Sequence, residues 1–375
     1  MPPFHVMDLL ARARKLEAEG QSIVHLEVGE PDFATARPIV DAGIQALRQL
    51  KTNYTAATGL PELRQAIADH YRHKYNLEIN PRRVVVTPGA SGALQLALSV
   101  LTDAGDSILL TDPSYPCNRN IAQVLGVNSI HVPVGAETQY QFVASLIGEH
   151  WQDNTRAAMV ASPSNPTGTL IERGVMQGVF EAVKKKHGHL IVDEIYQGLV
   201  YDAEEYTALA LSEEMFVINS FSKYFGMTGW RIGWMVVPEQ FVDVVDRVAQ
   251  NIFLAPPTIS QYAALVAFEP DTDEILQRRV AMFRERRDYL LPLLEEAGFK
   301  IPVQPQGAFY IYADCSAITD DSFQWTKDLL EKEGVAVTPG IDFGEFEANT
   351  HVRFSYTRSV DELKRAMCRI TRFIK

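Results

Sequence analysis

Short β-rich runs alternate with helical patterns between residues 60 and 240, and this alternation limits the fold more than any other feature of the chain. A helical spacing of apolar residues at 91–101, for instance, precedes an apolar run at 107–111. Parallel strands need crossover connections of this length, and these are usually helices. The sequence therefore predicts an α/β fold with a mainly parallel sheet of seven-stranded type and helices on both of its faces. The expected strands are 83–87, 107–111, 128–132, 156–161, 189–193, 215–219 and 231–237.

A second, smaller unit is expected from the two ends of the chain. The sequence has 375 residues, which is more than one hydrophobic core usually serves, so two domains are expected. A long charged helix is predicted at 272–297, and shorter strands and helices follow it. We therefore expect residues 46–275 to form a large domain. Residues 1–45 and 276–375 are expected to form a small α+β domain.

The overall charge argues against some classes of partner. The formal net charge is −12 and the pI is about 5.3, so the average field repels nucleic acid and anionic lipid. Two long stretches without charge, 84–102 and 248–268, contain proline and polar residues, and we interpret them as buried core rather than membrane spans. The first residues lack the basic-then-apolar pattern of a signal peptide. We expect a cytoplasmic protein that binds neither nucleic acid nor membrane.

The cysteines and histidines do not indicate a disulfide or metal site. The three cysteines lie far apart and form no CxxC motif, which fits a reducing compartment. Two histidine pairs, His70 with His73 and His187 with His189, have no obvious third ligand nearby. No bound metal is expected.

A lysine follows one of the expected strands, in the segment Ser220-Phe221-Ser222-Lys223. Lysine is usually a surface residue. At a strand end inside an α/β sheet, however, desolvation and nearby cations would lower its pKa and make it a nucleophile or a Schiff-base former. From this segment alone, a surface lysine in a loop remains an open interpretation.

An acidic residue, Asp193, ends the apolar strand expected at 189–193. A buried carboxylate needs a partner, because an unpaired buried charge is costly. A protonated pyridine nitrogen would be one such partner. A helix N-cap or a structural ion pair would explain the residue as well. In either case Asp193 lies at the end of its strand where α/β sheets bind ligands.

Three further segments contain polar groups that could face a ligand site. Residues 87–91, Thr-Pro-Gly-Ala-Ser, pass from a strand through a glycine turn to a helix start, whose free N–H groups can bind an anion. Many α/β turns look like this without binding a ligand. A rigid turn after strand 156–161 would place Asn165 at the sheet edge, although a plain turn explains it equally well. Arg353 alternates with apolar residues in a late strand. Facing inward it could bind a carboxylate with two hydrogen bonds, and facing outward it is a surface charge.

Taken in order, these segments resemble the fold-type-I pyridoxal 5'-phosphate (PLP) enzymes and, among them, the class I and II aminotransferases close to aspartate aminotransferase. The resemblance covers nearly the whole chain, and the order of the motifs carries it rather than any single one. The matching set is the Asn165 turn, the strand end with Asp193 and Tyr196, the Ser-Phe-Ser-Lys segment of Lys223, Arg231 and Arg353. The resemblance implies a ping-pong aminotransferase that acts on an L-amino acid and a 2-oxo acid. It also implies a homodimer with shared active sites.

The resemblance assigns a role at the PLP ring to each matching residue. Lys223 is expected to form the Schiff base, and Asp193 to keep the pyridine nitrogen protonated. Asn165 and Tyr196 are expected to hydrogen-bond the ring hydroxyl, and Tyr115 to stack on the ring. Lys223, Asp193 and Tyr196 are therefore the expected catalytic residues.

The resemblance also implies a phosphate site and a substrate site. The residues expected at the phosphate are Gly89, Ala90, Ser91, Ser220, Ser222 and Arg231, with Tyr54 reaching it from the neighbouring subunit. Arg353 is expected to bind the substrate α-carboxylate beside Asn165. Gly29 is expected in the loop that closes over the substrate.

The substrate and the reaction type stay open at this point. No further arginine for a side-chain carboxylate is found by motif, and the apolar segment 251–258 is expected to line the pocket, which favours neutral or aromatic substrates. A C–S lyase that eliminates at Cβ would use the same lysine, aspartate and arginine.

Outside PLP chemistry, Ser220-x-x-Lys223 fits a serine β-lactamase motif but lacks the later Lys-Thr-Gly. Gly89-x-Ser91 lacks the second glycine of a hydrolase nucleophile turn.

Overall fold

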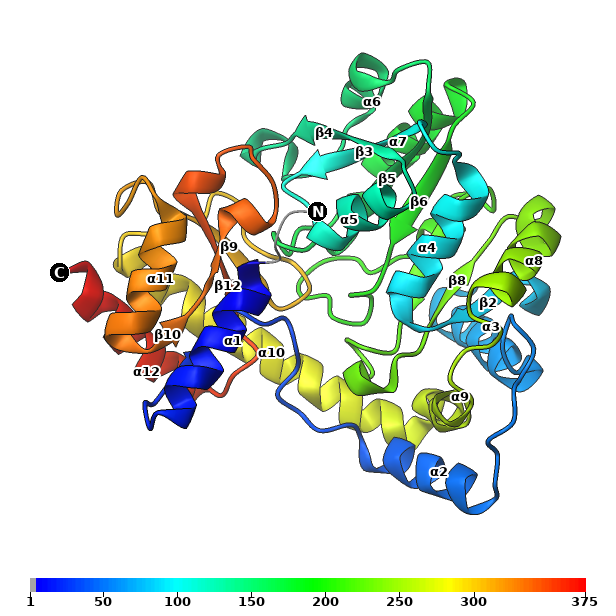
Figure 1. Cartoon of the computed structure of the whole chain (residues 1–375), viewed down its shortest axis with the longest axis horizontal. Helices are drawn as coiled ribbons and strands as arrows, with labels where there is room; N and C mark the ends of the chain where they lie inside the picture. Colours follow the sequence, from blue (N-terminus) through cyan, green and yellow to red (C-terminus); the bar gives the residue numbers. More distant parts are fainter. Residues whose placement is uncertain (1–4) are drawn as a thin grey trace.

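The central sheet has the strand order β2-β8-β7-β6-β5-β3-β4 (Figure 1). The computed structural model describes residues 5–375, and within them this sheet has seven strands. Strand β8 runs antiparallel to both of its neighbours, and the other neighbouring strands pair in parallel. The prediction of a mainly parallel α/β sheet is confirmed. The strands are β2 (Val84–Thr87), β3 (Ser107–Asp112), β4 (Asn128–Pro133), β5 (Thr155–Ala161), β6 (His189–Asp193), β7 (Phe216–Ser220) and β8 (Gly233–Val236).

Helices cover both faces of this sheet. Successive strand residues point to opposite sides, so a strand that is apolar on both sides has to be buried on both faces. In β2, Val84 and Val86 pack into one core, while Val85 packs into the other. All three are fully buried, so the strand is a continuous apolar run rather than an alternating one. Helices on the first face are α3 (Pro61–Tyr75), α6 (Ala144–His150) and α7 (Arg173–Lys185), and those on the second are α4 (Gly89–Leu101), α5 (Pro116–Val124) and α8 (Val242–Ile252).

A smaller α+β unit stands beside the sheet (Figure 1). Its antiparallel sheet has the order β11-β12-β9, and a short parallel pair joins β1 to β10. Its elements are α1 (His5–Ala18), β1 (Val24–His25), β9 (Tyr310–Asp314), α11 (Ser322–Glu333), β10 (Val335–Ala336), β11 (Thr338–Pro339), β12 (His351–Ser355) and α12 (Val360–Ile374). Segments from the two ends of the chain therefore lie side by side in this unit.

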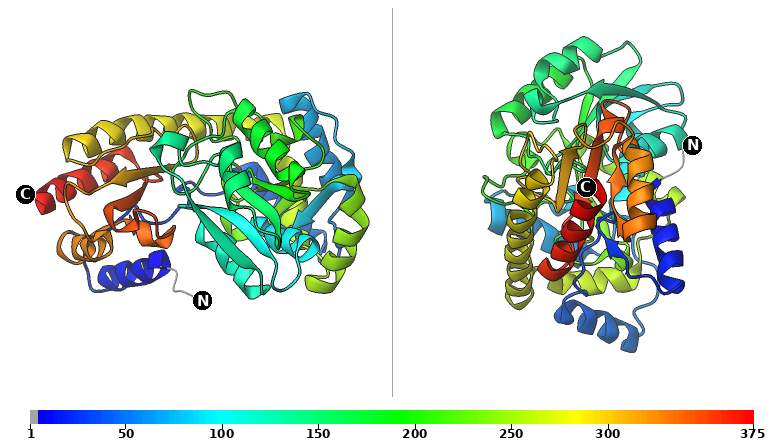
Figure 2. Two further views of the ribbon diagram at one scale, coloured as in Figure 1. Left: turned by 90° about the horizontal axis from the view of Figure 1, so that it is seen from above. Right: turned by 90° about the vertical axis from the view of Figure 1, so that its left-hand side faces the viewer.

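The long helix α10 (Pro270–Glu296) runs along the molecule, as Figure 2 shows in yellow. It packs against α12 of the smaller unit and against α2 (Arg37–Arg48), which itself lies on α9 (Thr258–Leu265). The expected domain boundaries after residues 45 and 275 fall inside α2 and α10 respectively, and they stay predictions. None of the helices within residues 5–375 is both long and apolar enough to cross a bilayer.

Three elements differ from the sequence-based expectation. The apolar pattern predicts neither α2 nor α6. In α2 the side chains of Ile44 and Leu47 are exposed while Ile39, Gly43 and Ala46 are buried, so large apolar residues lie on both sides of the helix and do not mark the buried one. The strand expected at 231–237 begins only at Gly233, because Arg231 has a left-handed φ of 51° that ends the preceding turn.

Candidate active site

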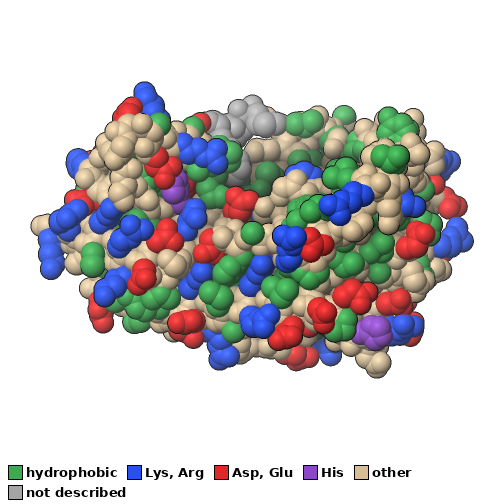
Figure 3. Space-filling model, turned by 90° about the horizontal axis from the view of Figure 1, so that it is seen from below, with side chains coloured by type: hydrophobic (Ala, Val, Ile, Leu, Met, Phe, Trp, Pro, Cys, Tyr) green, Lys and Arg blue, Asp and Glu red, His purple; other side chains and the backbone are tan. Residues whose placement is uncertain are grey.

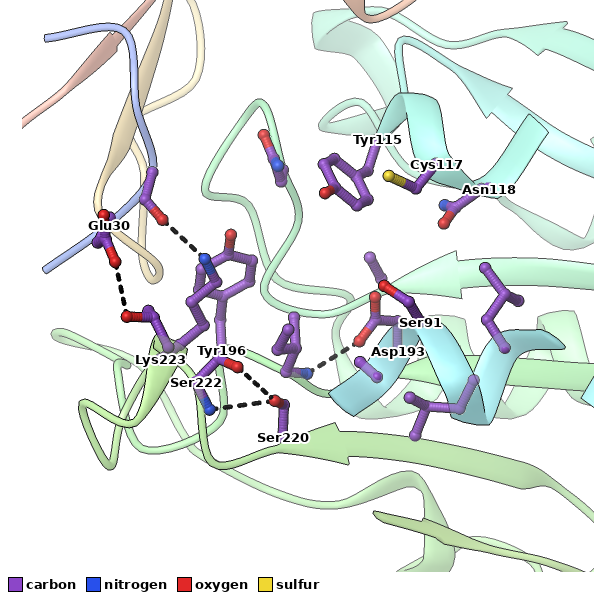
Figure 4. Close-up of a pocket in the computed structure, with 18 of the residues that line it drawn as sticks. Glu30, Ser91, Tyr115, Cys117, Asn118, Asp193, Tyr196, Ser220, Ser222 and Lys223 are labelled. Atoms are coloured by element: carbon purple, nitrogen blue, oxygen red, sulfur yellow. Dashed lines mark hydrogen bonds between the residues drawn. The ribbon is translucent and has the colours of Figure 1, made fainter. Parts of the chain in front are cut away.

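A cavity of about 300 Å³ lies at the carboxyl ends of β5, β6 and β7. Gly29, Tyr310 and Arg353 form its wall on the side of the smaller unit. Figure 4 shows polar side chains from separate segments pointing into this space. The predicted site residues that line it are Gly29, Ala90, Ser91, Tyr115, Asn165, Asp193, Tyr196, Ser220, Ser222, Lys223, Arg231 and Arg353.

Lys223 lies in the turn after β7 and points into the cavity (Figure 4). Its Nζ donates a hydrogen bond to the Gly29 carbonyl oxygen at 2.7 Å and lies 5.9 Å from the centre of the Tyr196 ring. Burial, with smaller contributions from Arg353 and Arg231, lowers the pKa of the Lys223 amine to about 8. A useful fraction of this amine is therefore neutral and nucleophilic near neutral pH. Lys223 is not a surface lysine in a loop, because its amine faces the cavity.

Asp193 ends β6 and presents its carboxylate to the cavity (Figure 4). Its Oδ1 accepts a hydrogen bond from the Ile195 backbone N–H at 3.0 Å. Burial raises the pKa of Asp193 to about 6, although that N–H group and Lys223 act in the opposite direction. A cationic ligand atom beside this carboxylate would stabilise its ionised form.

Arg353 turns inward from β12 and is only 4% exposed. Its Nη1 donates to Asn165 Oδ1 at 2.9 Å. Its guanidinium lies over the Tyr310 ring at 4.3 Å and over the Phe343 ring at 4.8 Å. Its Nε is buried without a hydrogen-bond partner among the described residues. The arginine thus has the inward orientation that carboxylate binding requires, and it keeps an unused donor.

Tyr310 is a site residue that the sequence analysis did not find. Its hydroxyl is 2.8 Å from the hydroxyl of Tyr196, and burial raises the pKa of both phenols, so both stay protonated. A Cβ on Gly29 would lie 1.7 Å from Tyr310 Oη, so the chain can pass this close only as glycine. The alternation of side chains along β9 could have indicated Tyr310, because Tyr310 and Tyr312 lie on the same face of the sheet as Arg353 on the neighbouring strand.

Backbone and hydroxyl donors lie together at the start of α4. Gly89 opens this helix with a φ of 72°, and the next two residues line the cavity. A Cβ on Gly89 would lie 2.4 Å from Arg231 Nη2, so the missing side chain lets Arg231 approach the helix start. The Ser220 and Ser222 hydroxyls, which are 3.0 Å apart, lie on the same side of the cavity (Figure 4). Helix N–H groups, hydroxyls and a guanidinium together can bind a multiply charged anion.

Residues 21–370 match the family model described as aminotransferase class I and II. The chain belongs to this family. It is 38% identical to a (5-formylfuran-3-yl)methyl phosphate transaminase of Methanocaldococcus jannaschii, over 99% of this chain and 96% of that protein. It is 37% identical to a valine–pyruvate aminotransferase of Mycobacterium tuberculosis, over 99% of this chain and 96% of the relative. The crystal structure of an aminotransferase from Mycobacterium tuberculosis matches with a TM-score of 0.96 at 36% identity, covering 100% of this chain and 97% of that one.

Family membership confirms the predicted class of enzyme. The chain is an aminotransferase, a transferase of nitrogenous groups, from a family that depends on PLP. The relatives named above are transaminases by name, so they give no support to the C–S lyase alternative.

Two predicted cofactor residues and one predicted pocket segment do not line the cavity of this aminotransferase. Gly89 lies behind the lining, against Arg231, while Tyr54 is 81% exposed and outside the cavity. Residues 251–258 are absent from the lining of the chain's own cavity, and the expectation that they line a pocket stays a prediction. The segment runs from the last residues of α8 to the start of α9 over the surface of the subunit, where Leu254 is exposed.

Proposed function

We propose that this aminotransferase binds PLP in the cavity and moves an amino group between an L-amino acid and a 2-oxo acid in a ping-pong reaction. The placement of Lys223 carries the proposal, since its amine has a lowered pKa and faces the cavity that Asp193 and Arg353 also line. A nucleophilic amine, a carboxylate for a ring nitrogen and a receptor for a carboxylate are thereby present in one cavity.

The residues that line the cavity fit the cofactor. The donors at the start of α4 suit the phosphate, and the absence of a side chain at Gly89 leaves Arg231 room to take part. The raised pKa of Asp193 suits a partner that brings a positive charge, such as a pyridinium nitrogen. The residues that would hold the ring and phosphate are Ala90, Ser91, Tyr115, Asn165, Asp193, Tyr196, Ser220, Ser222, Lys223 and Arg231.

When bound, PLP supplies an aldehyde that takes up the amino group and a ring that accepts electrons. Lys223 would hold the cofactor covalently through Nζ. Once the substrate amine has displaced it, the same Nζ would remove the proton from the substrate Cα. A lowered pKa suits this role, because a general base works best when its pKa lies near the operating pH.

Arg353 would bind the substrate α-carboxylate through charge-assisted hydrogen bonds. Asn165 and the Tyr310 ring restrict the guanidinium, so a carboxylate bound there takes a defined orientation. That orientation would present the Cα–H bond to Lys223, and positioning of this kind contributes much of an enzyme's rate.

The charges in the cavity favour neutral amino acids as substrates. Among the described residues, its basic side chains are Lys223, Arg231 and Arg353, and each already has a proposed role. The rest of the wall includes apolar side chains such as Val6 and Ile121. A second carboxylate on the substrate would therefore find no further basic partner among the described residues that line the cavity.

The two half-reactions test this proposal. PLP-loaded protein mixed with an L-amino acid alone should lose its visible absorbance, and 2-oxo acid added afterwards should restore it, because a ping-pong enzyme keeps the amino group between substrates. A panel of amino acids should show higher kcat/KM for neutral members than for aspartate. If an amino acid alone were converted into ammonia and a 2-oxo acid, with no amino-group acceptor added, this result would contradict transamination and indicate β-elimination.

We also infer a homodimer with shared active sites. Tyr54 is 81% exposed, and large hydrophobic side chains lie exposed nearby in sequence on and after α2, namely Ile44, Leu47 and Leu50. On the face seen in Figure 3, hydrophobic side chains are exposed among acidic and basic ones. Exposed apolar groups of this kind indicate an interaction surface. In such a dimer the Tyr54 hydroxyl would reach the partner's phosphate site, which is the role that the family resemblance implies.

Mixed dimers would show whether the sites are shared. Lys223→Ala and Tyr54→Phe subunits, each nearly inactive alone, should recover activity after subunit exchange. One site of each mixed dimer then has both native residues, so random pairing should give about a quarter of wild-type activity in a symmetric dimer. Native mass spectrometry, with one of the two variants labelled with heavy isotopes, should confirm that exchange occurs. No recovery despite exchange would show that Tyr54 serves its own subunit's site.

A further inference from the structure

We propose that Thr338 is a positioning residue whose hydroxyl fixes the orientation of the Arg353 guanidinium for carboxylate binding. The inference rests on the proposed role of Arg353. It assigns no chemical step to Thr338, which acts through the arginine and does not line the cavity.

The strand register places Thr338 beside Arg353. The two residues are directly opposite each other in the antiparallel pair of β11 and β12. Their side chains therefore project from the same face of the sheet. Thr338 is fully buried, and Arg353 is almost so.

The Thr338 hydroxyl, the Glu27 carbonyl oxygen and Arg353 Nη2 form a triangle of three hydrogen bonds. It donates to the Glu27 carbonyl oxygen at 2.9 Å, so its lone pairs remain to accept. Arg353 Nη2 donates to that hydroxyl at 3.2 Å and also to the Glu27 carbonyl oxygen. The hydroxyl therefore joins the arginine to the chain just before Gly29, where the smaller unit borders the cavity.

The triangle fixes a rotation that the other contacts leave free. The rings of Tyr310 and Phe343 lie against the guanidinium and restrict its tilt. Asn165 holds Nη1, and the triangle holds Nη2. Two anchors at different nitrogens prevent rotation within the guanidinium plane, whereas one anchor would allow it.

Replacing the hydroxyl with a methyl group would remove one of the two acceptors of Nη2 at nearly constant volume, and the Glu27 carbonyl would be the acceptor that remains. Nη2 would lose an acceptor in a buried place, where an unmet donor is costly. The guanidinium would then turn toward the acceptors that remain, and its donors would meet a carboxylate less well. PLP affinity should not change, because among the described residues the Thr338 side chain forms hydrogen bonds only with Glu27 and Arg353, and neither is proposed to hold the cofactor.

The test compares two ligands on PLP-loaded protein by absorbance titration. 2-Methylalanine carries the α-carboxylate but no Cα proton, and isopropylamine lacks the carboxylate. For Thr338→Val, the Kd of 2-methylalanine should rise roughly 3- to 10-fold, the range expected for one buried hydrogen bond. The Kd of isopropylamine and the affinity for PLP should not change. Thr338→Ser should restore binding to within about twofold of wild type, because it keeps the hydroxyl.

Two further variants make each result decisive. Thr326→Val is the matched control, since Thr326 is also fully buried and donates its hydroxyl within α11, to the Phe323 carbonyl at 2.9 Å. It should leave both Kd values unchanged. If Arg353→Ala weakens 2-methylalanine binding but Thr338→Val does not, this inference fails and the proposed function stands. If Arg353→Ala has no effect, the proposed role of Arg353 fails. If Thr338→Val weakens both ligands equally, or weakens PLP, its effect is general and the positioning role is overturned.

Discussion

Lys223→Ala is expected to abolish the visible absorbance of the PLP-treated protein and to lower kcat by at least about 10³-fold, the scale of losing a positioned general base. Both losses have one cause, because the same Nζ would hold the cofactor and move the Cα proton. The variant should still fold. Removing an amine whose pKa is lowered by burial relieves desolvation, so the unfolding midpoint of cofactor-free protein should not fall.

The control for this experiment is a lysine that the cavity does not use. Lys185 lies exposed on α7, and Lys185→Ala should retain both absorbance and turnover. Spectra, steady-state rates and thermal unfolding of both variants provide the comparison. Retention of the absorbance band together with activity in Lys223→Ala would end the proposed mechanism.

Arg353→Ala is expected to raise KM about 10²-fold for every amino acid tested, because it removes charge-assisted hydrogen bonds to a group that all of them share. The kcat should fall as well if the carboxylate also orients Cα. The substitution leaves the Asn165 side chain without its guanidinium partner, so some loss of stability is expected too. Kinetics across a panel of substrates, with unfolding measured in parallel, separates the two effects.

A neighbouring arginine distinguishes recognition from general damage. Arg358 follows β12 and donates to the His25 carbonyl at 3.2 Å without lining the cavity. Arg358→Ala should change stability more than KM. If the effect of Arg353→Ala were confined to one amino acid, Arg353 would be recognising that side chain rather than the common carboxylate.

The sequence predicted the part of the site that depends on strand ends. Asp193 and Lys223 follow apolar strands, and the carboxyl ends of parallel strands meet at one edge of a sheet. For Arg353 the alternating pattern left two faces possible. Only the packing of β12 against β9 and β11 shows that it points inward.

Contacts across distant segments could not be predicted in this way. Tyr310 and Thr338 meet Arg353 through strand register, which their local sequences do not specify. The close approach of Gly29 to Tyr310 depends on two segments of the chain that lie far apart in sequence. For residues 251–258 the apolar run could not show whether the segment faces a core, an interface or a pocket, and the segment does not line the chain's own cavity.

The chain's own contributions to the proposed cofactor site all come from one uninterrupted stretch, residues 89–231, whereas Gly29 and Arg353 come from the segments on either side of it. The residues proposed to hold PLP and the arginine proposed to bind the substrate carboxylate are thus encoded in separate parts of the gene. Changes in the outer segments should alter how the α-carboxylate is bound without removing any residue that this chain is proposed to contribute to its own cofactor site.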